Sequence, residues 1–343
     1  MKHFSKIFIT LFLAICLTPF IGLLLGFESA AGANEILSPP PRFGLTVLNE
    51  TAEYVADRFA LRQHLVSCWS WLNEKLLRTS AEEQVILGGD GFLFFSDTLD
   101  DYCGISLKEE ELERIAQRLA SLQEELEAEG KQFVFTIAPN KNSLYPGWMP
   151  AAYACRHEQS NAVRLLPWLK QYGVNYADLF TPLSEEMLYY KTDSHWTARG
   201  AALGADTILA ALGRESSYAS HSFGTEGIHK GDLYEMLYPA FSGREAETLD
   251  LSGLSFRALN DTNGGNAITI RTESEYGAGT LLCWRDSFGI ALYPYLADAF
   301  ESATFSRAAD YDLSRFADAE YDTVILEIVE RNIPRLLPAE LSE

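Results

Sequence analysis

The stretch from residue 106 to residue 139 constrains the fold most, because a bounded amphipathic helix leads directly into a wholly apolar strand. Ser106 and Glu109 fit a capping box at the start of the helix, and Gly130 is placed to stop it. One apolar stripe at helical spacing lies between them, formed by Leu112, Ile115, Leu119, Leu122 and Leu126. The run KQFVFTIAP then lacks the alternation of a half-exposed strand, so it predicts a parallel-sheet strand covered on both faces.

Helix and strand patterns continue to alternate after this unit. Further strands are expected at residues 174–179, 279–284 and 323–329. Helices are expected at residues 160–172, 197–212 and 289–300. This alternation is typical of an α/β three-layer sandwich with a mainly parallel central sheet, whose ligand site lies at the carboxyl ends of the strands.

Two segments do not follow the alternation. Residues 85–97, VILGGDGFLFFSD, place a Gly-rich turn between apolar runs and predict a hairpin. No Lys-Ser or Lys-Thr pair follows these glycines, which excludes a phosphate-binding loop. Residues 213–272 are rich in Gly, Ser and polar side chains, with a turn at Asn263, and we interpret them as an irregular insertion. One catalytic α/β domain is expected to span residues 81–343.

Residues 1–33 predict an export signal or a membrane anchor. The stretch from Ile7 to Gly26 carries no charge, which is long for a signal-peptide core and long enough to span a bilayer. Two alanines before residue 34 would suit cleavage, but on length we expect an uncleaved anchor. The preceding positive charges predict that the amino terminus stays inside and that the catalytic domain is extracytoplasmic. Residues 34–80 are then a Pro-rich juxtamembrane spacer followed by an amphipathic helix.

The charge balance and the cysteines limit the classes of partner and site. The chain has 343 residues and a formal net charge of -21. It would repel a phosphate backbone, so we expect no nucleic-acid partner, while neutral glycans or a cationic partner stay open. Cys68, Cys103, Cys155 and Cys283 lack the close pairs of a zinc site, so no metal is expected. Cys103 and Cys155 are the preferred disulfide pair, with free thiols as an equal alternative.

The segment YYKTDSHWTARG, residues 189–200, predicts a catalytic pair. In an extended segment residues i and i+2 point to the same side about 6.6 Å apart, so the Asp193 carboxylate can hold one nitrogen of His195. The other nitrogen is then free to activate a nucleophile. Ser287 fits that need, because LLCWRDSFGI carries it at a corner between a strand and a helix. The simpler alternative is that His195 fills a loop and Ser287 caps a helix.

Three further residues are candidates for oxyanion or substrate binding. Asn140 and Lys141 follow the strand of residues 131–139 and so lie at the same end of the sheet as Ser287. Asn140 could donate to an oxyanion, although Asn after Pro is also ordinary turn chemistry. Lys141 either binds an acidic group of the substrate or braces its loop. Arg285, two residues before Ser287, is the third candidate.

Taken together, these motifs resemble those of the DHHW family in the SGNH-hydrolase-like superfamily, which includes membrane-anchored alginate O-acetyltransferase subunits. The likeness rests on VILGGDGFLFF, Asn140-Lys141 with the Tyr-Pro that follows, YKTDSHW and RDSF, and covers roughly residues 50–330. Arg285 is a departure, because the superfamily's familiar Gly-Asp-Ser has glycine there.

The resemblance implies a function and partners. It implies Asp193, His195 and Ser287 as the triad of a polysaccharide O-acetyltransferase that needs no cofactor. It also implies a multi-pass membrane O-acyltransferase as the source of acetyl groups. The motifs leave open a carbohydrate esterase with the same triad, or a noncatalytic scaffold of an exopolysaccharide assembly machine. A metal-dependent hydrolase that uses Asp193, His195 and His229 is disfavoured, since His229 falls in the insertion without ligand spacing.

Overall fold

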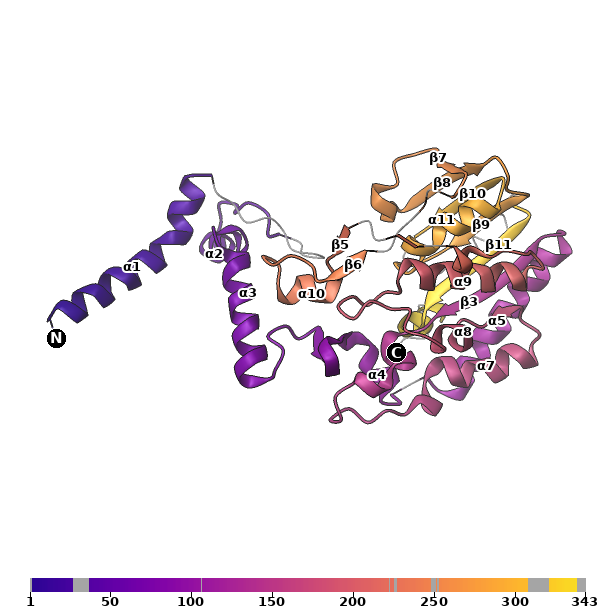
Figure 1. Cartoon of the computed structure of the whole chain (residues 1–343), viewed down its shortest axis with the longest axis horizontal. Coiled ribbons are helices and arrows are strands. Elements are labelled where there is room, and N and C mark those ends of the chain that lie inside the picture. Colours follow the sequence, from indigo (N-terminus) through magenta and orange to yellow (C-terminus); the bar gives the residue numbers. More distant parts are fainter. Residues whose placement is uncertain are drawn as a thin grey trace.

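A seven-stranded mixed sheet forms the centre of the protein, as the computed structural model shows (Figure 1). The structure describes residues 2–26, 37–105, 107–221, 223–224, 227–247, 251, 253–307 and 321–337. The strand order is β4-β3-β11-β9-β10-β8-β7. The strands are β3 (Gln132–Ala138), β4 (Tyr176–Ala177), β7 (Phe256–Ala258), β8 (Thr269–Ser274), β9 (Thr280–Trp284), β10 (Ser302–Ser306) and β11 (Thr323–Val329). Pairings from β4 to β10 are parallel, whereas β8 and β7 add antiparallel pairings at one edge.

Helices cover both faces of this sheet (Figure 1). The long ones are α5 (Glu109–Ala128), α7 (Asn161–Gln171), α9 (Ala198–Ala211) and α11 (Gly289–Ala299). Phe133 and Phe135 of β3 pack into the cluster that contains the apolar stripe of α5, while Val134 and Ala138 pack with α9 and α11. Both faces of β3 are therefore buried, which explains its unbroken apolar sequence and confirms the expected three layers.

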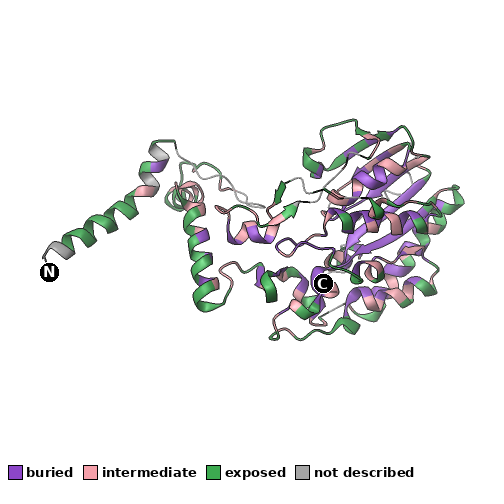
Figure 2. Cartoon of the chain, in the orientation of Figure 1, coloured by how far each residue is buried: buried purple, intermediate pink, exposed green. Residues whose placement is uncertain are grey.

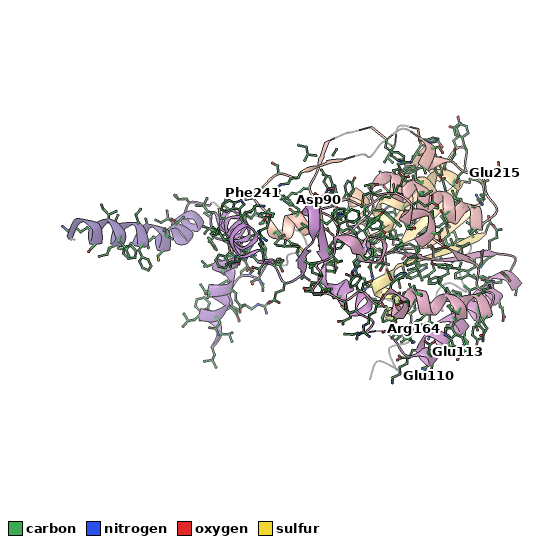
Figure 3. All side chains as sticks on the ribbon, turned by 60° about the horizontal axis from the view of Figure 1, so that its bottom comes forward. Asp90, Glu110, Glu113, Arg164, Glu215 and Phe241 are labelled. Carbon is green, nitrogen blue, oxygen red and sulfur yellow. The ribbon has the colours of Figure 1, made fainter. Side chains whose placement is uncertain are left out.

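Burial follows this layered arrangement. Buried residues are concentrated in the strands and on the inner helix faces (Figure 2). Charged side chains of α5 and α7, including Glu110, Glu113 and Arg164, lie toward the outside of the molecule (Figure 3). The solvent therefore meets an acidic, charged shell around an apolar centre.

Several predicted elements are found with nearly the predicted bounds. Strand β11 covers residues 323–329 as predicted, and all five apolar residues of the α5 stripe are buried. Gly130 ends this segment with a φ of 78°, a conformation that glycine adopts without strain. The helix begins at Glu109 with Lys108 as its N-cap, and the Lys108 amide donates to Glu111 Oε2 at 2.7 Å. The predicted cap Ser106 lies outside the described residues.

The predicted hairpin at residues 85–97 is present as β1 (Val85–Leu87) and β2 (Leu93–Phe95), which pair antiparallel. The prediction of an irregular insertion over residues 213–272 is partly wrong. Its second half supplies β7 and β8, which join the main sheet because alternate side chains of β8 are buried against it. Its first half holds β5 (Gly227–His229), β6 (Glu245–Glu247) and α10 (Asp232–Leu237). The remaining short helices are α4 (Leu99–Tyr102), α6 (Lys141–Leu144) and α8 (Phe180–Ser184).

The amino-terminal region consists of three helices that precede the α/β body. They are α1 (Lys2–Leu24), α2 (Val47–Arg58) and α3 (Arg62–Leu72). In Figure 1, α1 lies farthest from the sheet, and α3 lies between α1 and the α/β body. Among the described residues, no helix reaches the length and apolar character required of a bilayer span. The anchor and the boundaries at residues 33 and 80 stay predictions.

The predicted disulfide is not formed, since Cys103 and Cys155 are both free thiols. Their surroundings are shared nevertheless, because the Arg156 amide donates to the Tyr102 carbonyl at 2.9 Å. The Cys155 thiol contacts the Tyr102 hydroxyl instead of the Cys103 sulfur. Burial is the main cause of the raised pKa of Tyr102, and this contact is the second cause.

Candidate active site

A corner between β9 and α11 presents Ser287 at the carboxyl end of the sheet, where the ligand site was expected. Asp286 fixes this corner: its Oδ1 accepts from the Phe288 amide at 2.9 Å, and its Oδ2 accepts from the Val329 amide at 2.7 Å. The Asp286 amide in turn donates to Glu327 Oε2 at 3.0 Å inside the core. The Ser287 amide has no acceptor among the residues that the structure describes, so it is available to a ligand.

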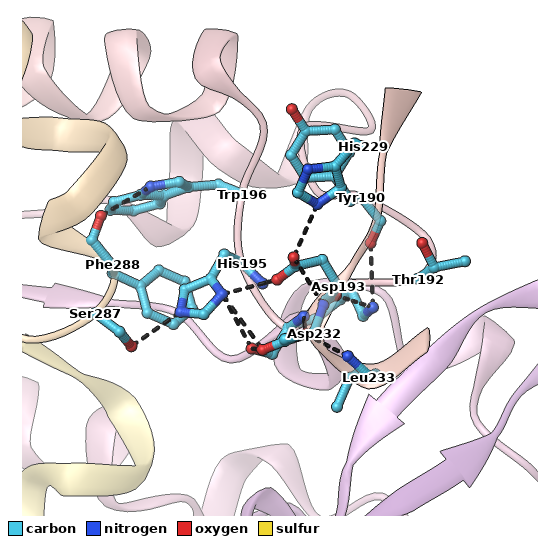
Figure 4. A network of polar contacts seen from close by, with 12 residues as sticks. Tyr190, Thr192, Asp193, His195, Trp196, His229, Asp232, Leu233, Ser287 and Phe288 are labelled. Atoms are coloured by element: carbon cyan, nitrogen blue, oxygen red, sulfur yellow. Dashed lines mark hydrogen bonds and ion pairs between the residues drawn. The ribbon is translucent and has the colours of Figure 1, made fainter. Parts of the chain in front are cut away.

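Three residues predicted from the sequence meet at this corner (Figure 4). His195 Nε2 lies 2.9 Å from Ser287 Oγ, and His195 Nδ1 lies 2.7 Å from Asp193 Oδ1. The His195 amide also donates to the same Asp193 oxygen at 2.9 Å, which fixes the carboxylate to the ring. Because a carboxylate only accepts, the proton of the neutral ring sits on Nδ1 and leaves Nε2 to accept from the Ser287 hydroxyl.

The electrostatics of the pair match this arrangement. Burial alone would lower the pKa of His195, but the hydrogen bond and charge of Asp193 outweigh it and the pKa ends above its ordinary value. Burial would likewise raise the pKa of Asp193, yet its hydrogen bonds to His195 and His229 hold it well below the usual range. Asp193 is therefore a carboxylate, and the His195 side chain keeps 26% of its surface exposed to accept a substrate.

The tryptophan of the motif connects the two halves of the site. Trp196 is buried, and its Nε1 donates to the Phe288 carbonyl at 3.2 Å. The Phe288 ring in turn lies 4.7 Å from the His195 ring, centroid to centroid. Trp196 thus ties the segment just before α11, which carries Ser287, to the loop that carries His195.

Two functional neighbours come from the insertion: Asp232 was not identified from the sequence, and His229 was considered only as part of a disfavoured metal site. His229 Nε2 lies 2.8 Å from Asp193 Oδ2, and its ring stacks on Tyr190 with centroids 3.9 Å apart. The Asp232 amide donates to the same Asp193 oxygen at 3.1 Å. The signal was the segment His229-Lys230-Gly231-Asp232, since a Cβ at Gly231 would lie 2.2 Å from the Thr192 carbonyl oxygen and only glycine allows this approach.

Lys141 supports the loop that carries Asp193 from inside the protein. It is buried, and its Nζ donates to the carbonyls of Tyr190 at 3.1 Å, Lys191 at 3.0 Å and Asp193 at 2.5 Å. Burial lowers its pKa to about 8, against the opposing charges of Asp193 and Asp232. Of the two alternatives for Lys141, the geometry supports the brace.

Arg285 is turned away from the substrate side. Its side chain is buried, and its guanidinium donates to the carbonyls of Gly265 at 2.7 Å and Ala267 at 3.1 Å. The aliphatic part fills the space beside Gly289, where a Cβ would lie 2.5 Å from Arg285 Cδ. The guanidinium is thus committed to the turn before β8, which corrects the expectation that it reaches the oxyanion or the substrate.

Asn140 belongs to a small polar group with Glu330 and Arg331. It is buried, and its amide donates to Glu330 Oε2 at 2.8 Å. Arg331, which follows β11, lies 3.5 Å from Asn140 Oδ1 and places its guanidinium carbon 5.7 Å from the centre of the Phe288 ring. The backbone of Asn140 is therefore engaged, and only its side-chain amide could serve an oxyanion.

A cavity of about 450 Å³ opens beside the triad. Asp193, His195 and Ser287 line it, and the rest of its wall is largely aromatic or aliphatic. The wall includes Tyr190, His229, Leu251, Ile290, Tyr293 and Pro294. Among the described residues that line this cavity there is no Lys or Arg. Its size suits a small part of a chain molecule rather than an acetyl group alone.

Two carboxylates and one imidazole of this site also have the chemistry of metal ligands. One atom each of Asp193, His195 and Asp232 lies within 4.8 Å of the others. Asp193 Oδ1 lies 2.7 Å from His195 Nδ1, and Asp232 Oδ2 accepts from the Ser194 hydroxyl at 2.5 Å. We therefore assign them to the serine-histidine-aspartate network.

Comparisons with known proteins place this geometry in context. Residues 85–248 match a family model described as the SGNH hydrolase-like domain of the acetyltransferase AlgX. Asp193 and His195 fall inside this segment, and Ser287 falls after it. A probable alginate O-acetylase AlgJ from Pseudomonas syringae is 29% identical over 222 residues, which cover 57% of this chain and 54% of that protein. The AlgJ of Pseudomonas putida is 24% identical over 233 residues, which cover 64% and 59%. The chain spans little more than half the length of these curated relatives.

Solved structures share the fold. A DHHW family protein from Eubacterium siraeum superposes with a TM-score of 0.51 at 17% identity, over 65% of this chain and 85% of the other. Bacillus cereus PatB1 gives 0.54 at 16% identity, over 73% and 95%. The resemblance inferred from the motifs is thus confirmed as a similarity: residues 85–248 match the SGNH hydrolase-like domain of the acetyltransferase AlgX, and the chain is similar to probable alginate O-acetylases.

Proposed function

We propose that this protein is a serine-dependent O-acetyltransferase that moves an acetyl group onto a hydroxyl of a polysaccharide. One observation carries the proposal: an unbroken line of contacts joins Asp193 Oδ1, both ring nitrogens of His195 and Ser287 Oγ. The match to an acetyltransferase family and the names of the AlgJ relatives support acetyl as the group that is moved.

In the first half of the reaction, Ser287 is acetylated. As Ser287 Oγ attacks the acetyl carbonyl of a donor ester, His195 Nε2 takes the hydroxyl proton and Asp193 stabilises the resulting imidazolium. The tetrahedral intermediate collapses, the donor's alkoxide leaves, and His195 returns the proton to it. Ser287 then carries the acetyl group as an ester.

In the second half, a sugar hydroxyl replaces the donor. It attacks the acetyl carbonyl of Ser287 while His195 Nε2 accepts its proton, and the same proton then goes to Ser287 Oγ as the enzyme ester breaks. The free Ser287 amide is the first oxyanion donor in this proposal, and the Asn140 side-chain amide is the second. Water in place of the sugar would make the protein an esterase.

The partners and location of the protein complete the proposal. The acceptor is a cell-surface or exported polysaccharide, and the donor is a multi-pass membrane O-acyltransferase. The uncharged residues 7–26 hold the protein in the cell membrane with its catalytic domain outside. Recovery of the full chain entirely outside the membrane fraction of expressing cells would overturn this placement.

The test uses an activated ester such as 4-nitrophenyl acetate with the full chain. Mass spectrometry should locate the acetyl group on Ser287, and added acceptor oligosaccharide should take it up faster than acetate is released. Ser287→Ala should lose both reactions by several orders of magnitude. Ser184→Ala is the matched control, since that serine is exposed on α8 and its hydroxyl donates to the Thr181 carbonyl.

The outcomes separate the competing functions. Release of acetate at every acceptor concentration and with varied glycans would make the protein an esterase. Normal polysaccharide acetylation in cells that carry only Ser287→Ala would make it a scaffold.

A further inference from the structure

A second carboxylate lies on the Nδ1 side of His195. Asp232 Oδ2 is 3.5 Å from His195 Nδ1, compared with 2.7 Å for Asp193 Oδ1 (Figure 4). Asp232 is the first residue of α10 and follows His195 by 37 positions. A serine-histidine-aspartate triad needs one carboxylate, so the second requires an explanation of its own.

Ser194 connects this carboxylate to the ring. Its hydroxyl donates to Asp232 Oδ2 at 2.5 Å, and its Oγ lies 3.2 Å from His195 Nδ1. A hydroxyl has one proton, and here Asp232 accepts it, so the Ser194 oxygen faces His195 with its lone pairs. The Nδ1 proton therefore has two acceptors, Asp193 Oδ1 directly and Ser194 Oγ backed by Asp232.

The position of Asp232 is fixed by four hydrogen bonds. Its Oδ1 accepts from the amides of Ser194 at 2.8 Å and Leu233 at 2.7 Å. Its own amide donates to Asp193 Oδ2 at 3.1 Å, and the fourth bond is that from the Ser194 hydroxyl. The two carboxylates are thus parts of one network and cannot move independently.

The sharing of Asp193 explains the need for a second acid. Its Oδ2 accepts from His229 and from the Asp232 amide, while its Oδ1 serves His195. A carboxylate with several donors holds its charge firmly but is a weaker acceptor toward any one of them. A second negative charge near Nδ1 compensates for that loss when His195 becomes an imidazolium.

We propose that Asp232 is a positioning residue of this active site, which acts through Ser194 and through its charge to favour the Nδ1-protonated and imidazolium forms of His195. The inference rests on the proposed function, because it concerns the base of that reaction.

The charged groups around Asp232 set the expected sign. Asp193 faces it from the motif, and Lys141 and Glu245 face the same buried space from α6 and β6. Arg331 opposes the protonation of His195 from beyond β11. Burial is the main cause of the raised pKa of Asp232, and the charge of Asp193 is the second cause. The charge of Asp232 in turn helps to raise the pKa of His195. Loss of that charge should lower the pKa of His195.

The experiment measures the rate of Ser287 acetylation by 4-nitrophenyl acetate against pH. Neutral His195 is the active base, so the rate falls as pH drops through its pKa. In Asp232→Asn the acid limb should move to lower pH by about one unit, and the plateau rate should fall about tenfold because the base is weaker. Ser194→Ala should shift the limb in the same direction by less.

Asp206→Asn is the matched control, since Asp206 also accepts from two backbone amides, those of Tyr218 and Ala219, but lies on α9 away from the triad. It should leave the acid limb in place. An unchanged limb in Asp232→Asn, or a shift to higher pH, would overturn the inference. If Asp232→Asn does not fold, the Ser194→Ala profile decides by the same criterion. Failure of the unmodified protein to acetylate Ser287 would instead refute the proposed function.

Discussion

At the scale of single residues, Lys141 shows how a buried cation can hold a catalytic loop. Lys141→Met would remove a charged donor from the carbonyls of Tyr190, Lys191 and Asp193, of which the Lys191 carbonyl also accepts from the Leu93 amide at 2.8 Å. Buried acceptors that lose their partners are costly, so we expect the free energy of unfolding to fall by about 3 kcal/mol. We also expect kcat to fall about tenfold, since Asp193 loses its support. Denaturant titration and steady-state kinetics measure the two effects.

Lys191→Met is the matched control for this prediction. The neighbouring lysine pairs with Asp90 at 2.7 Å, and the two side chains are 42% and 74% exposed. Exposed ion pairs contribute little, so stability and kcat should stay near their starting values. A selective rise in KM for an acidic acceptor in Lys141→Met, without loss of stability, would show that Lys141 binds substrate and would contradict the brace.

Local spacing, the position of Ser287 at the end of a strand and the family resemblance together predicted that Asp193, His195 and Ser287 converge. The first two are constrained by their separation of two residues, and Ser287 by the end of a recognisable strand. His229 and Asp232 could not be predicted in the same way, because their positions depend on how the insertion folds back over residues 190–193. The direction of Arg285 was equally hidden, since a side chain at a strand end can enter either the site or the core.

At the scale of elements, the antiparallel pair of strands β5 and β6 holds the motif loop. Glu245 on β6 accepts from the amides of Lys191 at 2.6 Å and Thr192 at 2.7 Å, and it also contacts the Thr192 hydroxyl. Glu245→Ala would free this loop, which presents Asp193 immediately afterwards. We expect kcat/KM for acetylation of Ser287 to fall about tenfold, because misplacement of the base is costly. Faster amide hydrogen exchange at residues 190–193 should accompany the loss.

A surface glutamate provides the comparison for Glu245. Glu273 on β8 pairs with Arg257, and their side chains are 47% and 73% exposed. Glu273→Ala should leave both the rate and the exchange of the motif loop unchanged. If Glu245→Ala behaves like Glu273→Ala, the pair of strands β5 and β6 does not hold the motif loop in place.

The strands that are buried on both faces were easier to predict from the sequence than those that are partly exposed. Strands β3, β9 and β11 lie in the middle of the sheet, and their continuous apolar runs made them recognisable. Strands β8 and β10 alternate buried and less buried residues and carry many Ser and Thr side chains, so their sequences did not stand out from loops. The antiparallel edge was missed for this reason, and with it the mixed character of the sheet.

At the scale of the whole molecule, the protein is strongly negative, and the described residues that line its active-site cavity include no Lys or Arg to offset that charge. The chain carries a net charge of -21, and no Lys or Arg is present among the described residues that line the cavity. Of the cations near the triad, Lys141 donates to three carbonyls, Arg285 donates to a turn, and Arg331 lies 3.5 Å from Asn140 Oδ1. The approach of an acceptor therefore depends on the acceptor's own charge.

Acetyl transfer from Ser287 should depend on the charge of the acceptor. An acidic polyuronate oligosaccharide is repelled by the protein at long range, and salt screens this repulsion because the Debye length shortens from about 30 Å at 0.01 M to about 10 Å at 0.1 M. Transfer to the polyuronate should thus become several times faster over this range of salt, whereas transfer to a neutral oligosaccharide of equal length should hardly change. Rates of acetyl-Ser287 decay with each acceptor, measured by mass spectrometry, provide the comparison. A fall in the polyuronate rate with added salt would mean that a basic surface attracts the acceptor, and that the net charge does not govern its approach.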